Sequence, residues 1–393
     1  MESYLKNSPA YSLRQLTGYF LKLGYSGFGG PVALVGFMHR DLVEDKKWIS
    51  DEDYKEGLAL AQLAPGPLAA QLGIYIGFIH YRILGATLAG LAFVLPSFLM
   101  VVVLGMAYKA FGGLLWMQAA FYGVGAAVIG IIALSSYKLT IKSVSKFNVK
   151  AIRATWVLWL LYFTGLLITV LTQSEEVLLF VGAGLIYMFY KSRPKQIILK
   201  ASMPVLLFAK FGFWEYHPDQ LAKVGIFFLK AGAFVFGSGL AIVPFLHGGV
   251  VLENHWLTET QFIDAVAVAM ITPGPVVITV GFIGYLIGGF PGASIASLAT
   301  FLPCYLFTII PAPYFKKIAK IKSIKAFVEG ITSAVMGALM GSVIVIASRS
   351  IQDIPTFLIA VVSLLVLIYL KEIKEPVIIL MSASIGIIIK MLL

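Results

Sequence analysis

The chain has 393 residues, of which 59% are apolar and only 12% are charged, whereas about 25% are charged in an ordinary soluble domain. This composition excludes a soluble globular protein and indicates one that is largely embedded in a membrane. The 30 Lys and Arg residues exceed the 19 Asp and Glu residues, which gives a net charge of +11. In so apolar a chain, we attribute this excess to cytoplasmic membrane loops rather than to nucleic-acid binding.

The N-terminal segment and the cysteine content narrow the class further. Residues 1–15 are polar and lack the apolar core and cleavage site of a signal peptide, so we expect the N-terminus to be retained. Cys304 is the only cysteine and lies within an apolar run. The sequence therefore contains no disulfide framework and no cysteine-based metal cluster.

The first predicted elements are two interrupted apolar segments. Residues 12–38 contain the break Gly27-Phe28-Gly29-Gly30-Pro31, and residues 54–80 contain Pro65-Gly66-Pro67. Proline removes a helical donor and glycine tolerates the dihedral angles of a reversal, so each segment is predicted to open at its break. We interpret both as re-entrant hairpins that return to the side on which they start.

Apolar runs of about 20 residues predict full spanning helices. In chain order they cover residues 83–107, 115–136, 152–172, 177–190, 196–213, 292–313, 326–348, 355–370 and 376–393. Two further breaks, Gly237-Ser238-Gly239 and Pro273-Gly274-Pro275, precede the sixth of these runs. The predicted fold is an all-α polytopic membrane protein with nine full spans and four hairpins. Counting hairpin arms as spans would change only the total.

The second half of the chain repeats the first. A shift of 208 residues aligns residues 20–39 with residues 228–247, and it aligns the two Pro-Gly-Pro breaks with each other. About a third of positions 20–73 are identical to their partners. We therefore divide the chain into residues 1–213, with a repeat core at 12–136, and residues 222–393, with a repeat core at 222–348.

Positive charges predict opposite orientations for the two halves. The loop around Trp48 is rich in Lys and Arg, whereas the matching loop around Trp256 has none and carries Glu253 and Glu259. Because cytoplasmic loops are enriched in Lys and Arg, the two loops are predicted to lie on opposite sides of the membrane. The halves would then form an inverted-topology repeat, which secondary transporters use to place one substrate site near the midplane.

The four breaks are the first candidates for a binding site. Irregular backbone at membrane depth is tolerated only where protein buries it or where it lines a cavity, and helix N-termini at such breaks offer free N–H groups to an anion. The alternative is that the glycines only allow close helix packing. The candidate substrate-binding residues at the breaks are Phe28, Gly29, Gly30, Pro65, Gly66, Pro67, Gly237, Ser238, Gly239, Pro273, Gly274 and Pro275.

Polar side chains near the breaks complete the predicted site. Lys22 and Lys230 occupy matching positions within apolar runs, where a charge usually faces a cavity or a partner, and together they would attract a dianion. The alternative is that each snorkels to the membrane surface. Hydrogen bonds to an oxyanion are expected from Ser26, Gln62, Gln71, Thr272 and Thr279, although Ser and Thr also bond to their own helix backbone.

Glu56 and Asp264 are a matched pair of carboxylates within the repeat. Intramembrane carboxylates serve as proton relays, so both residues are candidates for proton coupling. A favourable interaction with a nearby helix N-terminus is the alternative explanation. His39 and His247 also match, and we interpret them as interfacial polar groups.

Signatures of other functional classes are missing from the sequence. It contains no HExxH, GxSxG or Walker A motif and no ligand cluster with metal spacing, so we expect no enzymatic activity, no cofactor and no metal. The basic residues lie in short loops without an aromatic platform, which disfavours a nucleic-acid partner. A membrane scaffold or receptor that moves nothing would be expected to carry large soluble loops or tails, which the predicted spans do not leave room for.

Three stretches carry a resemblance to a known family: FGGP at residues 28–31, WISDEDYKEGLALAQLAPGPLAAQLGIYIGF at 48–78 and GLAFVLPSFLM at 90–100. They closely resemble the chromate ion transporter family, whose long-chain members have two homologous halves with FGG-type and PGP-type signatures. The resemblance covers about residues 12–136 and 222–348. It implies efflux of chromate, a toxic mimic of sulfate, across the cytoplasmic membrane, coupled to the proton-motive force.

The family motif is complete only in the first half, where it maps onto Phe28, Gly29, Gly30, Pro31, Trp48, Gln62, Pro65, Gly66, Pro67, Gln71 and Pro96. In the second half, Ser238 and Gly239 replace the second glycine and the proline, and Met270 and Thr279 replace the two glutamines. The two half-sites are therefore predicted to be chemically unequal. A sulfate-like substrate, a channel mechanism and a homodimer in the bilayer remain open.

Overall fold

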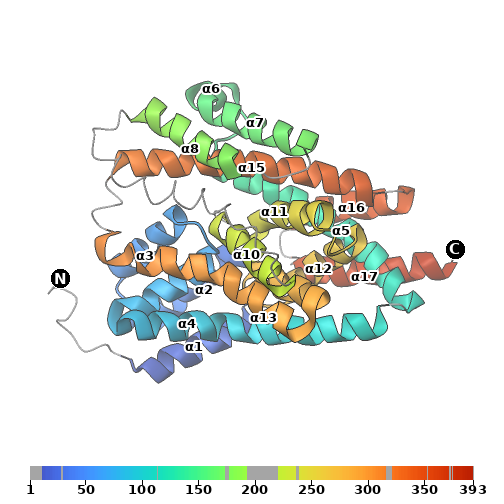
Figure 1. The fold of residues 1–393 in the computed structure, drawn as a ribbon, viewed down its shortest axis with the longest axis horizontal. Helices are drawn as coiled ribbons and strands as arrows, with labels where there is room; N and C mark the ends of the chain where they lie inside the picture. The colour runs from blue at the N-terminus through green and yellow to red at the C-terminus, as the bar shows by residue number, and fades with distance from the viewer. Residues whose placement is uncertain are drawn as a thin grey trace.

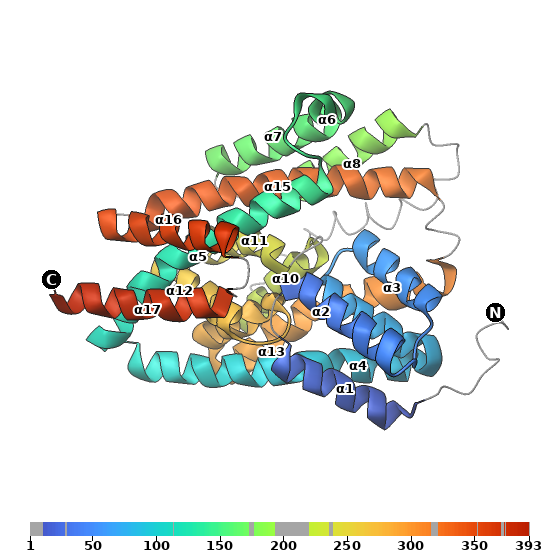
Figure 2. The same ribbon diagram turned by 180° about the vertical axis from the view of Figure 1, so that it is seen from behind.

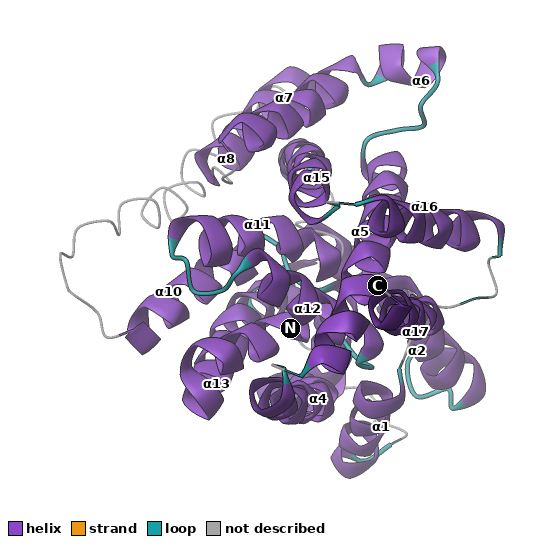
Figure 3. Ribbon diagram, turned by 90° about the vertical axis from the view of Figure 1, so that its right-hand side faces the viewer, coloured by secondary structure: helices purple, strands orange, loops and turns teal. Residues whose placement is uncertain are grey.

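The computed structural model describes residues 11–27, 30–112, 114–172, 177–192, 220–235, 239–315, 321–351, 353–370, 373 and 375–392. Every regular element in these residues is helical (Figure 3), which confirms the predicted all-α class. Four described helical segments are long and apolar enough to cross a membrane: Leu68–Phe111, Leu115–Ser143, Val276–Tyr314 and Lys322–Ser350. Long apolar helices of this kind are typical of a polytopic membrane protein.

The two halves contain matching series of elements. The first half has α1 (Leu13–Ser26), α2 (Gly30–His39), η2 (Arg40–Asp45), α3 (Asp51–Leu63), α4 (Leu68–Phe111), α5 (Leu115–Ser143), α6 (Val149–Ala154), α7 (Trp156–Thr172) and α8 (Val177–Lys191). The second half has α10 (Gln220–Ala233), η4 (Gly239–Ile242), α11 (Val243–His247), η5 (Gly248–Glu253), α12 (Glu259–Ile271), η6 (Val276–Ile278), α13 (Thr279–Ile309), η7 (Ala312–Tyr314), α15 (Lys322–Ser350), α16 (Ile354–Tyr369) and α17 (Glu375–Leu392). The matched helices α1 and α10 have 14 residues each, and α3 and α12 have 13 each.

Both interrupted segments of the first half fold back on themselves, whereas their return to one side of a membrane stays a prediction. The Tyr19 hydroxyl donates a hydrogen bond to Asp41 at 3.3 Å, which brings the middle of α1 beside the residues that follow α2. In the next hairpin, Gly57 of α3 faces the ring of Tyr75, because a Cβ at Gly57 would lie 2.3 Å from that ring. Each contact joins residues at similar distances on either side of the break between them, as expected for antiparallel arms.

Helix α4 itself contains a second reversal. Arg82 has φ 52° and ψ −140°, which is outside the helical region. The chain turns back at this residue, and Gly77 and Gly85 meet across the turn. A Cβ at either glycine would lie within 2.3 Å of the carbonyl oxygen of the other. Thus α4 consists of a short arm, residues 68–81, and a long arm, residues 83–111.

Helix α13 repeats this reversal in the second half. Its backbone leaves the helical region at Gly288 and Gly289, where Gly289 has φ 61°. Gly284 and Gly292 meet across the turn as Gly77 and Gly85 do, since each hypothetical Cβ would lie within 2.4 Å of the opposite carbonyl oxygen. We call residues 279–287 the short arm and residues 290–309 the long arm of α13.

The two long arms lie side by side and run in opposite directions (Figures 1 and 2). Thr87, near the start of the α4 arm, shares a hydrogen bond of 2.7 Å with Tyr305, near the end of the α13 arm. Further along, Phe98 contacts Phe290 at the start of the α13 arm, with 6.1 Å between ring centroids. The halves therefore meet through antiparallel equivalents of the same helix.

The remaining long helices form a scaffold in which helices of each half pack against helices of the other half. Helix α5 of the first half packs against α16 and α17 of the second, and α15 of the second half packs against α7 and α8 of the first. Small residues permit this close approach, as at Gly130, where a Cβ would lie 2.6 Å from the Ala360 carbonyl oxygen, and at Gly337, where it would lie 1.8 Å from that of Tyr162. Close contact at small residues is how helices associate in membranes, where burial of apolar surface supplies little driving force.

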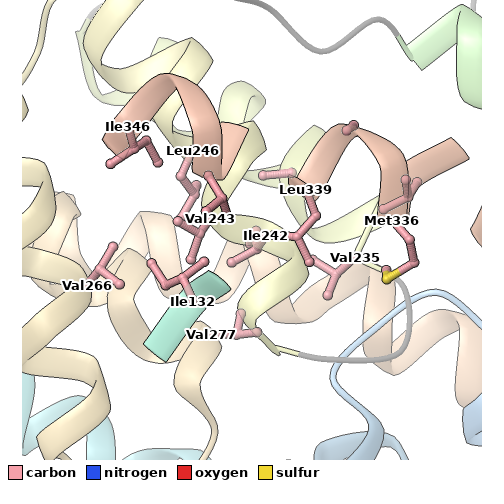
Figure 4. Close-up of a cluster of buried hydrophobic side chains, with 14 of the residues drawn as sticks. Ile132, Val235, Ile242, Val243, Leu246, Val266, Val277, Met336, Leu339 and Ile346 are labelled. Atoms are coloured by element: carbon pink, nitrogen blue, oxygen red, sulfur yellow. The ribbon is translucent and has the colours of Figure 1, made fainter. Parts of the chain in front are cut away.

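The larger of the buried apolar clusters among the described residues lies between this scaffold and the hairpins of the second half, and a second cluster lies among the hairpins of the first half. Figure 4 shows apolar side chains from α5, η4, α11, α12, η6 and α15 converging on one another. Val235, which follows α10, packs into this cluster near Leu339 and Met336. The cluster thereby fixes the backbone of Val235, which belongs to the central site.

Most predicted spans have a helical counterpart. The runs at 83–107 and 292–313 form the long arms of α4 and α13, and those at 115–136 and 326–348 form α5 and α15. Residues 152–172 form two pieces, because α6 ends at Ala154 and α7 begins at Trp156. The runs at 177–190, 355–370 and 376–393 form α8, α16 and α17. The run at 196–213 lies outside the described residues.

Candidate functional site

The hairpin tips of the two halves cross at the centre of the molecule. The Gly66 N–H donates to the Val235 carbonyl at 2.5 Å, and the Gly274 N–H donates to the Gly27 carbonyl at 2.9 Å. The repeat shift of 208 residues converts one hydrogen bond into the other. Each Pro-Gly-Pro tip therefore binds the glycine break of the opposite half, and we call this region the tip crossing.

Glycine is required at the centre of both Pro-Gly-Pro motifs. Gly66 has φ 142° and Gly274 has φ 97°, values that side-chain-bearing residues rarely adopt. A Cβ at Gly66 would lie 2.7 Å from Gln71 Nε2, and a Cβ at Gly274 would lie 2.0 Å from Ser97 Oγ. Both the backbone conformation and the available space thus select glycine.

Helix N-termini converge on the tip crossing from both halves. Helix α2 begins at Gly30 and α4 at Leu68, and η6 and α13 begin just after Pro275. The first N–H groups of a helix have no acceptor within the helix and carry a partial positive charge. The amides of Gly66 and Gly274 are already bonded to carbonyls, and the Thr279 N–H at the start of α13 is bonded to the Val276 carbonyl. The candidate donors to an anion are therefore those at the starts of α2, α4 and η6.

Gln71 and Thr279 are the repeat-matched polar residues behind the tips, and both side chains are fully buried. Gln71 Nε2 donates to the Pro65 carbonyl at 2.8 Å and has a second hydrogen to donate, while its Oε1 has no partner among the described residues. The Thr279 hydroxyl donates to the Val276 carbonyl at 2.7 Å. The two half-sites thus differ in the donor that they can offer.

Two other predicted hydroxyl groups bond to their own helices. The Thr272 hydroxyl is buried and donates to the Val268 carbonyl at 2.6 Å, and the exposed Ser26 donates to the Lys22 carbonyl at 2.7 Å. This is the backbone bonding that was the alternative interpretation of these residues.

Two residues at the tip crossing were not identified from the sequence as site residues. Ser97 of α4 and Cys304 of α13 are fully buried repeat mates, each following the matched proline of its half. Ser97 Oγ donates to the Gly24 carbonyl at 3.2 Å and closes over Gly274. Cys304 Cβ lies 3.1 Å from the Cβ position of Gly66. Each long arm therefore supplies one small side chain to the tip of the opposite half.

Lys22 and Lys230 lie on the outer faces of their helices. Lys22 is exposed on α1, opposite the buried stripe that contains Phe20 and Leu23, and Lys230 is exposed on α10. Gln62 is also exposed, near the end of α3. The tip crossing buries none of these three side chains, although each stands within about two turns of a break.

The matched carboxylates are both sequestered on the entering arms of their hairpins. Asp264 is 3% exposed on α12 and accepts a hydrogen bond from the Tyr108 hydroxyl at 2.6 Å. Both carboxylate oxygens of Glu56 on α3 are buried. Each residue lies ten positions before the glycine of its tip, so the structure separates the carboxylates from the tip crossing by about two helical turns.

Histidine–carboxylate pairs join the hairpins of each half at the ends far from the tips. His39 Nε2 lies 3.1 Å from Asp51 Oδ1, and His247 Nε2 lies 2.7 Å from Glu259 Oε2. The shift of 208 residues aligns the two pairs. Each pair connects the returning arm of the first hairpin to the start of the second, so the matched histidines hold the two hairpins of a half together.

The two pairs are supported differently. Hydrogen bonds from Lys55 and His39 hold the pKa of Asp51 below its ordinary value. Glu259 pairs with Arg349 of α15, at 2.6 Å, in addition to His247. The second pair thereby connects the hairpins to the scaffold.

The matched tryptophans lie beside these pairs. Trp48 stacks on Tyr11 with 4.9 Å between ring centroids. Trp256 contacts Phe227 at 5.7 Å and lines an open cavity of about 420 Å³ together with Arg349.

Some predicted residues lie outside the described part of the chain, namely Phe28, Gly29, Gly237 and Ser238. Gly239 is described; it begins η4 and lies close to Val276 and Val277 near the second Pro-Gly-Pro. Within the described ranges, no group of three or more His, Cys, Asp or Glu side chains could hold a metal ion.

Comparisons with known proteins agree with this architecture. The sequence profile of the chromate transporter family matches residues 14–188 and 222–387. A chromate transport protein of Cupriavidus metallidurans is 61% identical over 97% of this chain and 94% of its own length. A protein of Synechococcus elongatus, named "probable chromate transport protein", is 55% identical over 98% of both chains. The chromate transport protein of Pseudomonas aeruginosa is 30% identical over 88% of this chain and 84% of its own. No solved structure matches the chain significantly.

Proposed function

This chain belongs to the chromate transporter family, and from that premise we propose that it exports chromate from the cytoplasm as a proton-driven secondary transporter. The observation that carries the proposal is the reciprocal pair of hydrogen bonds at the tip crossing, Gly66 to Val235 and Gly274 to Gly27. They hold broken helices of both halves around one point, which is how many secondary transporters build a substrate site.

The proposed substrate is a tetrahedral dianion. The N-termini of α2, of α4 and of the helical run that η6 and α13 form together would each stabilise negative charge by about 0.3–1 kcal/mol, or up to about 2 kcal/mol where burial reduces screening. The second hydrogen of Gln71 Nε2 would add a donor on one side only. Because Gln71 and Thr279 differ, we expect the anion to be bound more tightly by the first half.

The proposed mechanism is alternating access between inverted halves. Support comes from the antiparallel long arms of α4 and α13, whose contacts at Thr87 with Tyr305 and at Phe98 with Phe290 relate the halves by reversal. The opposite loop charges around Trp48 and Trp256 support the same reversal across the membrane. Rocking of the hairpins against the scaffold would open the tip crossing to one side at a time.

Proton coupling is assigned to the buried carboxylates Asp264 and Glu56. Both lie on helical arms that end at the tip crossing. Protonation of either carboxylate would therefore shift the position of an arm that also positions the anion. In export, protons would enter the cell as chromate leaves.

The decisive experiment is chromate uptake by purified protein in proteoliposomes. We expect chromate to accumulate in the lumen when the lumen is more acidic than the outside, and the accumulation to stop when a protonophore is added. Sulfate and molybdate should inhibit chromate uptake in proportion to their affinities for the protein. Equilibration down the chromate gradient alone, with no effect of the pH gradient, would instead indicate a channel and overturn the proposed coupling. Stronger competition by sulfate than by chromate itself would reassign the substrate.

The same assay tests the two lysines. If Lys22 and Lys230 attract the dianion, Lys22→Ala and Lys230→Ala should each raise the half-saturating chromate concentration about tenfold, equivalent to about 1.4 kcal/mol. Lys223→Ala is the matched control, because Lys223 is exposed on α10 two turns before Lys230. Unchanged saturation in both variants would assign the lysines to the membrane surface.

A further inference from the structure

One hydrogen bond links the proposed coupling carboxylate of one half to the other half. Tyr108 lies near the end of the α4 long arm, and its hydroxyl donates to Asp264 Oδ2 on α12 at 2.6 Å. The ring of Tyr108 is held between Phe121 and Phe282, at centroid distances of 5.4 and 5.5 Å. Ring packing thus fixes the Tyr108 hydroxyl in the long arm of α4, whereas its acceptor, Asp264, lies on α12, which is one arm of a hairpin.

This hydrogen bond cannot have an exact counterpart in the first half. The repeat mate of Asp264 is Glu56, but the shift of 207 residues that aligns the later helices places Phe315 opposite Tyr108. Phenylalanine has no hydroxyl to donate. The two matched carboxylates are therefore unequal, because the tyrosine that holds Asp264 to the opposite half has a repeat mate without a hydroxyl.

Other charges near α12 are occupied elsewhere. Glu259 on α12 pairs with His247 and with Arg349 of α15. On neighbouring helices, Lys109 lies over the Tyr285 ring and Lys390 of α17 lies over the Tyr122 ring. Among the described residues, Tyr108 is the titratable side chain that contacts the Asp264 carboxylate.

We propose that Tyr108 is a positioning residue that couples protonation of Asp264 to the separation of the two halves. The inference rests on the proposed proton-driven transport. A hydrogen bond to an ionised carboxylate is about twice as strong as one to a neutral acceptor, so a proton that binds Asp264 from the aqueous phase weakens the link and frees α12 from α4. Conversely, movement of α12 away from Tyr108 removes a donor that favours the ionised form, and Asp264 then takes up a proton.

The test compares Tyr108→Phe with Tyr122→Phe. Tyr122 makes the same kind of hydrogen bond, donating to Asp353 at 2.6 Å, but within the scaffold between α5 and α16. Asp264→Asn completes the set. Each variant is assayed in proteoliposomes for accumulation driven by a pH gradient, for exchange of labelled against unlabelled chromate at equal pH, and for the dependence of accumulation on pH.

Asp264→Asn should abolish gradient-driven accumulation and retain exchange, because exchange requires only that the loaded protein reorients. Tyr108→Phe should move the pH of half-maximal accumulation upward by about one unit, because loss of a hydrogen bond to the carboxylate makes Asp264 easier to protonate. Tyr122→Phe should match the unmodified protein in all three measurements.

An unshifted pH dependence in Tyr108→Phe, with exchange intact, would overturn the role of Tyr108. So would an equal shift in Tyr122→Phe, since the effect would then not depend on contact with Asp264. If Tyr108→Phe fails to fold, Asp264→Glu provides the second test. The longer side chain moves the carboxylate relative to the fixed Tyr108 hydroxyl, so the pH dependence should shift, and an unshifted pH dependence would overturn the role of Tyr108. Failure of the unmodified protein to respond to a pH gradient would count against the proposed function instead, so the two outcomes are distinguishable.

Discussion

At the scale of single residues, Gly274 is the position at which the tip crossing tolerates least change. Gly274→Ala should reduce chromate transport severely and lower the free energy of unfolding by about 1–3 kcal/mol. Its φ of 97° disfavours a side chain, and the new Cβ would lie 2.0 Å from Ser97 Oγ. Uptake assays and thermal unfolding in detergent would measure the two effects.

Gly18→Ala is the matched control, because a Cβ at Gly18 in α1 meets nothing within 4 Å. Alanine there should raise helix stability by a few tenths of a kcal/mol to about 1 kcal/mol. Normal transport by Gly274→Ala would contradict the close approach at the tip crossing.

The residues of the site could be predicted from the sequence only in part. Proline and glycine indicated the tips because their backbone effects are local, and Gln71 and Thr279 were identified because they follow the tips directly. Ser97 and Cys304 reach the same region from a different helix of the opposite half. Nothing near them in the sequence specifies that contact, although their places after the matched Pro96 and Pro303 are a usable signal.

At the scale of elements, the reversals within α4 and α13 depend on pairs of small residues. Gly85→Val should force the arms of α4 apart, because even a Cβ at Gly85 would lie 2.2 Å from the Gly77 carbonyl oxygen. We expect a loss of about 1–3 kcal/mol in the free energy of unfolding, measured by thermal unfolding in detergent. The repeat mate Gly292→Val should give a similar loss.

A suitable comparison is Gly36→Ala in α2, where a Cβ meets nothing within 4 Å. If Gly85→Val and Gly292→Val were as stable as Gly36→Ala, the arms would not be packed as closely as Gly77 and Gly85 indicate.

The helices themselves were largely predictable, whereas their partners were not. Length and apolar composition located α5, α7, α8, α15, α16 and α17 to within a few residues. Their pairing across the halves, α5 with α16 and α17 and α15 with α7 and α8, could not be read from the sequence. A soluble helix marks its buried side with an apolar stripe, but a membrane helix is apolar on all sides, and its contacts depend on small residues whose partners only the fold identifies.

At the scale of the whole molecule, the two halves are related by a pattern that repeats at every level. A shift of 208 residues relates the tip hydrogen bonds and the histidine–carboxylate pairs, and a shift of 207 relates the glycine contacts of α4 and α13. Several departures from this pattern involve polar side chains, among them Gln71 against Thr279, Ser97 against Cys304 and Tyr108 against Phe315. Duplication thus accounts for the architecture, and substitution within it accounts for a site whose two sides can do different chemistry.

The orientation of the halves in the membrane leads to the last prediction. Lys46 and Asn254 are repeat mates, and both are exposed in the segments that follow η2 and η5. In a Cys304→Ser background, Lys46→Cys and Asn254→Cys each provide one thiol. If the halves are inverted, a membrane-impermeant thiol reagent added to intact cells should label the position-254 variant fully and leave the position-46 variant unlabelled, and inside-out vesicles should give the opposite result. Cys304 is fully buried, so the unsubstituted chain serves as the unlabelled control. Labelling of both variants from the same side would mean that the two halves are not inverted. The antiparallel long arms of α4 and α13 would then have to lie along the membrane surface rather than across the membrane.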